Sequence, residues 1–191
     1  MTGKKTIKIG ITGGIGSGKS FVCAELARRG ISVYDCDSAA KRIMRSSDNV
    51  RTALTRLIGP ETYDGDGRLN KAAVAAFLLA SAENAAAIAA IVHPAVADDF
   101  RRSGNSWMEC AILFETGFNR LVDRVVAVTA PEDVRIRRVM ERDGITHENA
   151  LEWMGRQWPQ EEVRRRADHE IVNDGVADIG RQIDELIVKL K

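Results

Sequence analysis

The sequence predicts an α/β fold in which a largely parallel sheet carries helices on both faces. Short apolar or alternating segments typical of strands recur along the chain, and helical patterns separate them. Strands that alternate with helices form βαβ units, so we expect about five parallel strands in a three-layer arrangement. Candidate strands cover residues 6–12, 31–34, 107–114, 123–129 and 169–172.

Helical patterns fill the intervals between these strands. The stretch 70–102 is rich in alanine and predicts two helices that are interrupted near Pro94. Residues 144–167 are polar and rich in charge, and we expect them to bury little. Further helices are expected over 17–29, 38–45, 132–143 and 176–190.

Composition limits the class of protein before any motif is considered. The 191 residues suit one domain with insertions, and 45% hydrophobic side chains provide a core. A net charge of +1 argues against a protein that coats nucleic acid by bulk charge. No apolar run is long enough for a transmembrane helix, and the N-terminus lacks the pattern of a signal peptide. The 3 cysteines form no CxxC pair, which fits a reducing cytosol. From the charge, the apolar runs and the cysteines together, we expect a cytoplasmic protein without membrane or nucleic-acid partners.

A glycine-rich segment after the first strand matches the phosphate-binding pattern G-x-x-x-x-G-K-[ST]. Its glycines let successive backbone N–H groups turn towards phosphate oxygens, and the following helix adds the positive end of its dipole. Lys19 would reach the β- and γ-phosphates of ATP, and the Ser20 hydroxyl would bind Mg²⁺. The sequence therefore predicts a nucleoside-triphosphate site in a P-loop NTPase fold. The segment reads Gly13-Gly14-Ile15-Gly16-Ser17-Gly18-Lys19-Ser20.

The rest of the chain narrows the class of P-loop protein. The N-K-x-D element with which regulatory GTPases read guanine is absent, and the chain is too short for a large motor ATPase. We therefore expect a small phosphotransferase whose acceptor meets the γ-phosphate of ATP. The alternatives are a kinase for another nucleotide or small hydroxyl acceptor, and a nucleotide-dependent switch without catalytic activity.

Acidic residues at strand ends are candidates for the acceptor side of the site. Asp35 and Asp37 follow the second strand and would stand beside the phosphate loop if that strand neighbours the first. One of these two carboxylates could act as a general base and accept the proton of an acceptor hydroxyl. The alternative for Asp37 is a structural role, in which it only caps the helix that follows. Glu115 ends an apolar strand, where it could hold a Mg²⁺-bound water, grip the acceptor or only begin a helix.

Arginines and one histidine complete the candidate site. Arg138 and Arg142 are four residues apart on one helix face, and with 143–167 they predict a mobile lid that closes on ATP. For each arginine the alternative is a solvated surface position. His93 is a candidate for acceptor contact, with a structural role as its alternative.

Taken together, these motifs resemble those of the dephospho-coenzyme A kinase family. They occur in the family's order and span nearly the whole chain. The resemblance implies that the γ-phosphoryl group of ATP is transferred, with Mg²⁺, to the ribose 3′-hydroxyl of dephospho-CoA. The matching segments are residues 11–20, Asp35-Cys36-Asp37, His93-Pro94, Leu113-Phe114-Glu115, Arg138 with Arg142-Asp143, Ala167-Asp168 and Ile171-Val172-Asn173 with Gly175.

The resemblance also implies roles for individual residues. Asp37 is the family's proposed base, while His93 and Glu115 belong to the acceptor side. Asn173 falls where the family's chain passes close to the adenine of ATP. The residues implied in ATP binding are Gly14, Ile15, Gly16, Ser17, Gly18, Lys19, Ser20, Phe21, Arg138, Arg142 and Asn173.

The implied organisation is one kinase chain with a core, an insertion and a lid. The core covers about 1–45, 105–142 and 168–191, the helical acceptor (CoA-side) insertion about 46–104, and the lid about 143–167. The sequence departs from the family where Phe21 replaces Thr, and in the lid, where Trp153 and Val163 replace Arg and Lys. Arg156 and Arg164 are candidates to supply the missing cations.

Overall fold

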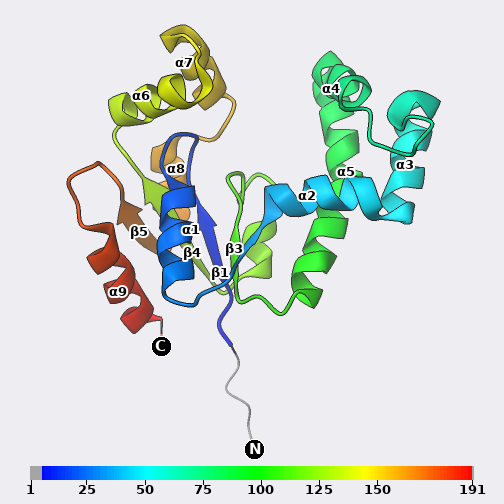
Figure 1. Ribbon diagram of the computed structural model, residues 1–191. Helices are drawn as coiled ribbons and strands as arrows, with labels where there is room; N and C mark the ends of the chain where they lie inside the picture. The colour runs from blue at the N-terminus through cyan, green and yellow to red at the C-terminus, as the bar shows by residue number, and fades with distance from the viewer. Residues whose placement is uncertain (1–5, 191) are drawn as a thin grey trace, which may run out of the picture. The chain divides into compact units, whose positions relative to one another are not determined.

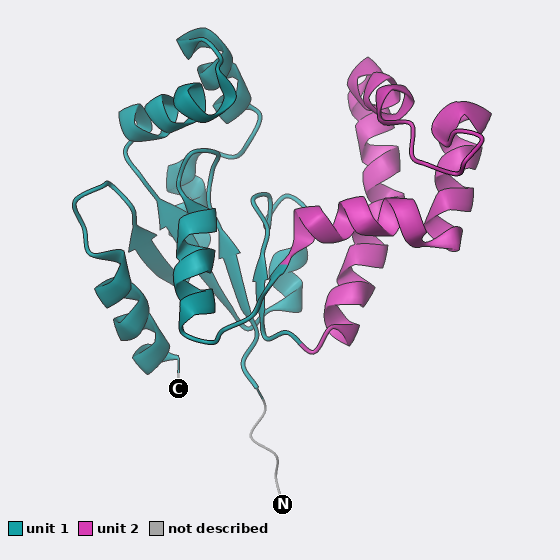
Figure 2. Cartoon of the chain, in the orientation of Figure 1, with its two compact units in different colours: residues 1–34, 105–191 teal, residues 35–104 magenta. Residues whose placement is uncertain are grey.

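The computed structural model describes residues 6–190 and divides them into two compact units. Unit 1 holds 6–34 and 105–190, and unit 2 holds 35–104 (Figure 2). The strands are β1 (Ile9–Thr12), β2 (Val33–Asp35), β3 (Trp107–Glu109), β4 (Arg124–Thr129) and β5 (His169–Val172). Figure 1 labels all of them except β2. Unit 1 also contains α1 (Lys19–Arg28), η2 (Phe118–Leu121), α6 (Glu132–Asp143), α7 (His147–Gly155), α8 (Gln160–Arg166) and α9 (Ile179–Lys189).

The strands form one sheet in the order β2-β3-β1-β4-β5, with β1 at its centre. β1 pairs in parallel with both β3 and β4, so that Ile9 lies opposite Trp107 on one side and Arg124 on the other. β4 pairs in parallel with β5, with Val126 opposite His169. The predicted α/β fold with a five-stranded parallel sheet is therefore confirmed. Ligands of such sheets bind beyond the carboxyl ends of the strands, where β1 enters the glycine loop.

The main apolar core of unit 1 lies between the sheet and the helices α1 and α9. Alternate residues of each strand enter it, as Val126 and Val128 do on β4 and Ile171 does on β5. The opposite face of β5 carries Glu170, which accepts a hydrogen bond from Arg164 of α8 at 2.9 Å. Because neighbouring strand residues point to opposite faces, α8 covers the face away from α1 and α9. The sheet is thus the middle of three layers, as expected.

The strand expected over 107–114 is shorter than the sequence suggests, because β3 ends at Glu109. Its neighbour β1 ends at Thr12 and turns into the glycine loop, so the residues beyond Cys110 have no strand beside them to pair with. Their backbone bonds are local instead: Thr116 N–H donates to the Ile112 carbonyl at 3.0 Å. This segment therefore forms turns in which Leu113 is buried and Ile112 is exposed, and Glu115 does not end a strand.

Unit 2 is built around one long helix. The predicted interruption near Pro94 is wrong, because α5 (Ala82–Arg102) continues through that proline. The break lies at Ser81, which is extended and whose hydroxyl oxygen accepts a hydrogen bond from Asn84 N–H at 3.1 Å. Pro94 and Ala90 are exposed, so the Ala90 carbonyl that Pro94 cannot serve is open to water. The other elements of unit 2 are α2 (Cys36–Ser46), α3 (Asp48–Ile58), η1 (Pro60–Thr62) and α4 (Lys71–Ala80).

The unit boundaries differ from the bounds expected for the insertion, because unit 2 begins at Asp35 and not at 46. Within 144–167, α7 buries Ala150 against α6, and α8 buries Val163 and packs on β4. The other residues of the segment are exposed or half-buried, so it buries little, as its composition predicts. Among residues 6–190, no helix combines the length and the apolarity needed to cross a membrane.

Candidate active site

The glycine loop between β1 and α1 has a shape that only glycine can follow at two positions. Gly16 and Gly18 have φ values of +79° and +85°, in the left-handed region. A Cβ on Gly16 would lie 2.6 Å from the backbone oxygen of Arg135, and one on Gly18 would collide with the side chain of Asn173. The loop is therefore packed directly against α6 and the end of β5. This is the backbone cradle that the motif predicts.

Two polar side chains inside the loop are prepared for a ligand. Lys19 Nζ donates to the Gly13 carbonyl at 2.8 Å and lies 3.8 Å from the carboxylate of Glu109. Burial lowers the pKa of Lys19 below its ordinary value of 10.5, although the negative charge of Glu109 opposes that shift. Ser17 is fully buried, and its Oγ has no hydrogen-bond partner among the residues that the structure describes. An anion with several oxygens would serve both side chains, so the loop fits a phosphate group.

An acid that sequence reasoning missed, Glu109, lies beside the phosphate loop. Asp35 and Asp37 were expected beside the loop if the second strand neighboured the first, but β3 lies between β1 and β2. That order places the end of β3 next to β1 and brings Glu109 to Lys19. A single charged residue within an otherwise apolar strand was the signal that could have identified Glu109.

Two further missed residues hold the backbone of Ile15. Arg135 is 6% exposed, and its Nε donates to the Ile15 carbonyl at 2.9 Å. Burial lowers the pKa of its guanidinium from its ordinary value. Gln157, from the connection between α7 and α8, accepts a hydrogen bond from Ile15 N–H through Oε1 at 2.7 Å. Neither residue differs in local pattern from surface arginines and glutamines, so no sequence signal reveals this contact.

Arg138 and Asn173, both expected on the ATP side, meet at the phosphate loop. Asn173 Nδ2 donates to the Ser17 carbonyl at 3.0 Å, and its Oδ1 accepts from Arg138 Nη2 at 3.2 Å. Arg138 Nη1 also donates to the Asn173 carbonyl at 3.0 Å and to the Gly16 carbonyl at 3.4 Å. The pair braces the loop from the carboxyl end of β5. Because the brace bonds to carbonyl groups of the loop, it leaves the loop's N–H groups, apart from those of Ile15 and Ser17, to a ligand.

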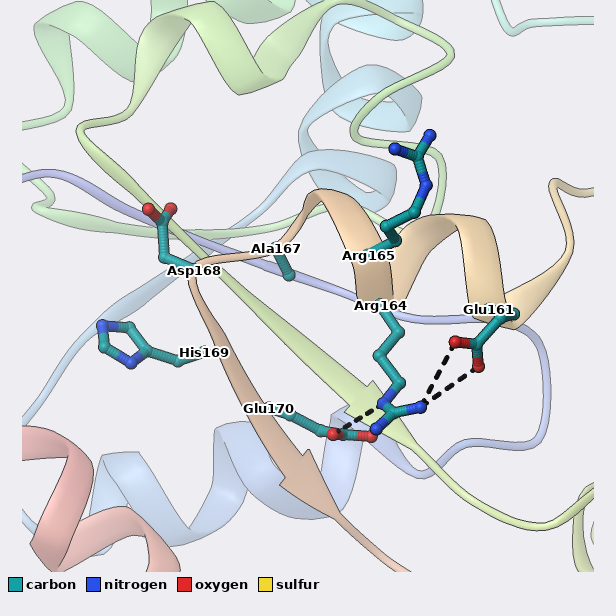
Figure 3. Close-up of a pocket in the computed structure, with 7 residues that line it drawn as sticks. All are labelled: Glu161, Arg164, Arg165, Ala167, Asp168, His169 and Glu170. Atoms are coloured by element: carbon teal, nitrogen blue, oxygen red, sulfur yellow. Dashed lines mark hydrogen bonds and ion pairs between the residues drawn. The ribbon is translucent and has the colours of Figure 1, made fainter.

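The remaining expected arginines are engaged with carboxylates. Arg142 forms a two-bond ion pair with its neighbour Asp143, and Arg156 pairs with Glu152 at 2.6 Å. Arg164 lies between Glu161 and Glu170, as Figure 3 shows. Arg164 and its two partners line an open pocket of about 380 Å³ near the start of β5, away from the carboxyl ends of the strands where the phosphate loop lies. The residues that line it are Glu161, Arg164, Arg165, Ala167, Asp168, His169 and Glu170.

Asp35, and not Asp37, caps the helix that follows β2. Asp35 Oδ1 accepts hydrogen bonds from the N–H groups of Asp37 and Ser38, at 2.9 and 3.0 Å. These bonds, with one from the Ser38 hydroxyl, lower the pKa of Asp35 against the opposing effect of burial. Asp37 lies in the first turn of α2 with its carboxylate exposed, and it forms an ion pair with Lys41. The capping alternative for Asp37 is therefore wrong.

His93 and Glu115, the other expected acceptor-side residues, lie in different units. His93 is on α5 of unit 2, where partial burial lowers the pKa of its imidazole. Glu115 is in unit 1, where its Oε1 accepts a hydrogen bond from Trp158 N–H at 3.3 Å. The preceding Phe114 stacks on the Trp158 ring, with the ring centroids 6.1 Å apart. Glu115 thus contacts the connection between α7 and α8.

The parallel sheet and the glycine loop with its largely buried Lys19 define a P-loop protein. A family model described as dephospho-CoA kinase matches residues 7–178, and the chain belongs to this family. The chain is 40% identical to the dephospho-CoA kinase of Bacteroides fragilis, over 96% of this chain and 93% of that protein. It is 36% identical to that of Chlorobaculum tepidum, over 100% of this chain and 98% of that protein.

Solved structures agree with the fold. A protein from Thermus thermophilus superimposes with a TM-score of 0.83 and 35% identity, over 97% of this chain and 98% of that one. Dephospho-CoA kinase from Campylobacter jejuni gives a TM-score of 0.68 at 17% identity, over 96% of each chain. Shikimate kinase from Acinetobacter baumannii gives 0.57 at 14% identity, over 97% of this chain and 93% of that one. The resemblance stated from the motifs is confirmed.

Proposed function

We propose that this chain transfers the γ-phosphoryl group of ATP to the ribose 3′-hydroxyl of dephospho-CoA, which yields coenzyme A and ADP. The observation that carries the proposal is an intact phosphate loop, with buried Lys19 and unpartnered Ser17 Oγ, in a member of the dephospho-CoA kinase family. We expect this reaction in the cytoplasm, and the absence of membrane and nucleic-acid partners stays a prediction from composition.

The phosphate side of the reaction uses the loop. Between Gly14 and Ser20, the backbone N–H groups other than those of Ile15 and Ser17, which are already bonded within the protein, donate to the phosphate oxygens. Phe21 follows them in the first turn of α1. Lys19 exchanges its bond to the Gly13 carbonyl for the β- and γ-phosphates. The exposed Ser20 hydroxyl fits a Mg²⁺ ligand; when bound, that ion neutralises charge between the phosphates.

The acceptor side of the reaction uses Asp37, His93 and Glu115. The Asp37 carboxylate takes the proton of the 3′-hydroxyl, whose oxygen forms a bond to the γ-phosphorus as the bond to ADP breaks. Because Asp35 caps α2, the Asp37 carboxylate is not needed for that cap; it is exposed and would give up its ion pair with Lys41 for this step. His93, in the acceptor insertion proposed for 46–104, and Glu115, which contacts the lid proposed for 143–167, bind the acceptor. Arg138, Arg142 and Asn173 act on the ATP side.

An acceptor panel tests the proposal. Purified protein is incubated with Mg-ATP and one acceptor at a time: dephospho-CoA, a nucleoside monophosphate, shikimate or none. ADP release is followed by a coupled assay, and the phosphorylated product by mass. We expect acceptor-dependent ADP release with dephospho-CoA and a background rate with the others. A preference for another acceptor would contradict the substrate, and ADP release independent of any acceptor would contradict kinase activity.

A further inference from the structure

Ile15 is the residue of the phosphate loop that is held most completely by other elements. Its carbonyl accepts from Arg135 Nε at 2.9 Å, and its N–H donates to Gln157 Oε1 at 2.7 Å. Its side chain packs on the small apolar cluster between α6 and α7, which contains Val139 and Ala150. The backbone N–H, the backbone carbonyl and the side chain of Ile15 are thus all held by residues outside the loop.

Gln157 connects this loop residue to a second fixed point. The next residue, Trp158, donates its backbone N–H to Glu115 Oε1, and its ring stacks on Phe114. The guanidinium of Arg166 lies 4.5 Å from the centroid of the same ring. The connection between α7 and α8 is therefore anchored on both sides, and Gln157 transmits that anchoring to the phosphate loop.

We propose that Gln157 is a positioning residue that sets the shape of the phosphate loop through Ile15. Ile15 lies between two glycines, whose backbones are conformationally permissive. The two hydrogen bonds therefore restrict the orientation of the peptide groups on either side of Ile15. With the Ile15 N–H committed to Gln157, the donors that follow it in the loop are held in place before ATP arrives. Ile15 itself then contributes to ATP binding through loop shape and not through its own N–H. This inference rests on the proposed function only in naming ATP as the ligand.

The test compares two glutamines that make the same kind of bond. Gln157→Met removes the acceptor oxygen at the loop and keeps the side-chain length. Gln182→Met is the matched control, because Gln182 Oε1 accepts from the Val172 N–H at 2.9 Å on the outer edge of β5. The dissociation constant of a non-hydrolysable ATP analogue with Mg²⁺ is measured by calorimetry, alongside thermal unfolding and the KM for each substrate.

We expect Gln157→Met to weaken binding of the analogue about five- to tenfold, the equivalent of one lost hydrogen bond. The KM for dephospho-CoA should stay within about twofold, and Gln182→Met should leave analogue binding within the same limit. Gln157→Asn, which is polar but too short to reach Ile15, should show the same pattern more weakly if the first variant does not fold. Analogue binding that is equal in the unaltered chain and in a folded Gln157 variant would overturn the proposal.

The calorimetric measurement needs no acceptor. A chain that does not phosphorylate dephospho-CoA would contradict the proposed function, while the effect of Gln157 on binding of the analogue would still be observed. Failure of one proposal is therefore distinguishable from failure of the other.

Discussion

Replacing Asn173 by alanine tests whether the carboxyl end of β5 braces the phosphate loop. The change removes the bond from Nδ2 to the Ser17 carbonyl and the bond from Arg138 to Oδ1. Each hydrogen bond contributes about 1 kcal/mol, and the Ser17 carbonyl is left buried without its partner, so the free energy of unfolding should fall by about 2–3 kcal/mol. For a chain of this length, that loss lowers the midpoint of thermal unfolding by about 5–10 °C.

The assay is thermal unfolding by circular dichroism, paired with the KM for ATP. Asn149→Ala is the control, because Asn149 is exposed on α7, and its midpoint should change by less than about 2 °C. We expect Asn173→Ala to lower the midpoint and raise the KM for ATP together, since a loosened loop binds phosphate less well. An unchanged midpoint with weakened ATP binding would refute the brace and would leave Asn173 as a nucleotide contact alone.

Three further changes test the acid–base groups and the long helix. Asp37→Asn should keep ATP binding within about twofold and lower turnover about 10²- to 10⁴-fold, with Asp48→Asn as an exposed helix-start control; undiminished turnover would remove Asp37 from the role of base. Burial lowers the pKa of Lys19, so kcat/KM should begin to fall with rising pH at a pH below 10.5. Because the negative charge of Glu109 raises this pKa, Glu109→Gln should move the fall in kcat/KM to lower pH. In the same window the unfolded chain binds more protons at Lys19 than the folded chain, so this group makes stability rise with pH. An alkaline limb that Glu109→Gln leaves in place would argue against the ion pair. Pro94→Ala should stabilise α5 by about 1–3 kcal/mol in urea unfolding, and no gain would show that the helix already absorbs the proline.

Local patterns in the sequence predicted most of the fold. The helix expected over 132–143 and the strand over 169–172 have the bounds that the structure gives them. The glycine loop was identified because its function demands particular residues at fixed spacing. The break expected at Pro94 was wrong, because the loss of one backbone hydrogen bond on an exposed face of α5 is not enough to end the helix.

The parts that could not be predicted depend on contacts between distant residues. β3 ends at Glu109 because its neighbour β1 ends, and the sequences of the two strands do not show that they are neighbours. Gln157 reaches Ile15 across 142 positions of the chain, and a glutamine in a polar segment carries no sign of such a partner. Site residues that act on the backbone of other residues are thus the hardest to identify from sequence.

The contact of Asn173 with the phosphate loop also determines when, during synthesis of the chain, the loop can reach its final shape. Ser17 leaves the ribosome early, whereas the side chain that holds its carbonyl follows 156 residues later. Until β5 has been made and has paired with β4, the loop lacks this support and the neighbouring Arg138 lacks its partner amide. A nascent chain therefore completes its nucleotide site only after β5 has been made, and fragments that stop before Asn173 should bind ATP poorly even though they contain the whole glycine motif.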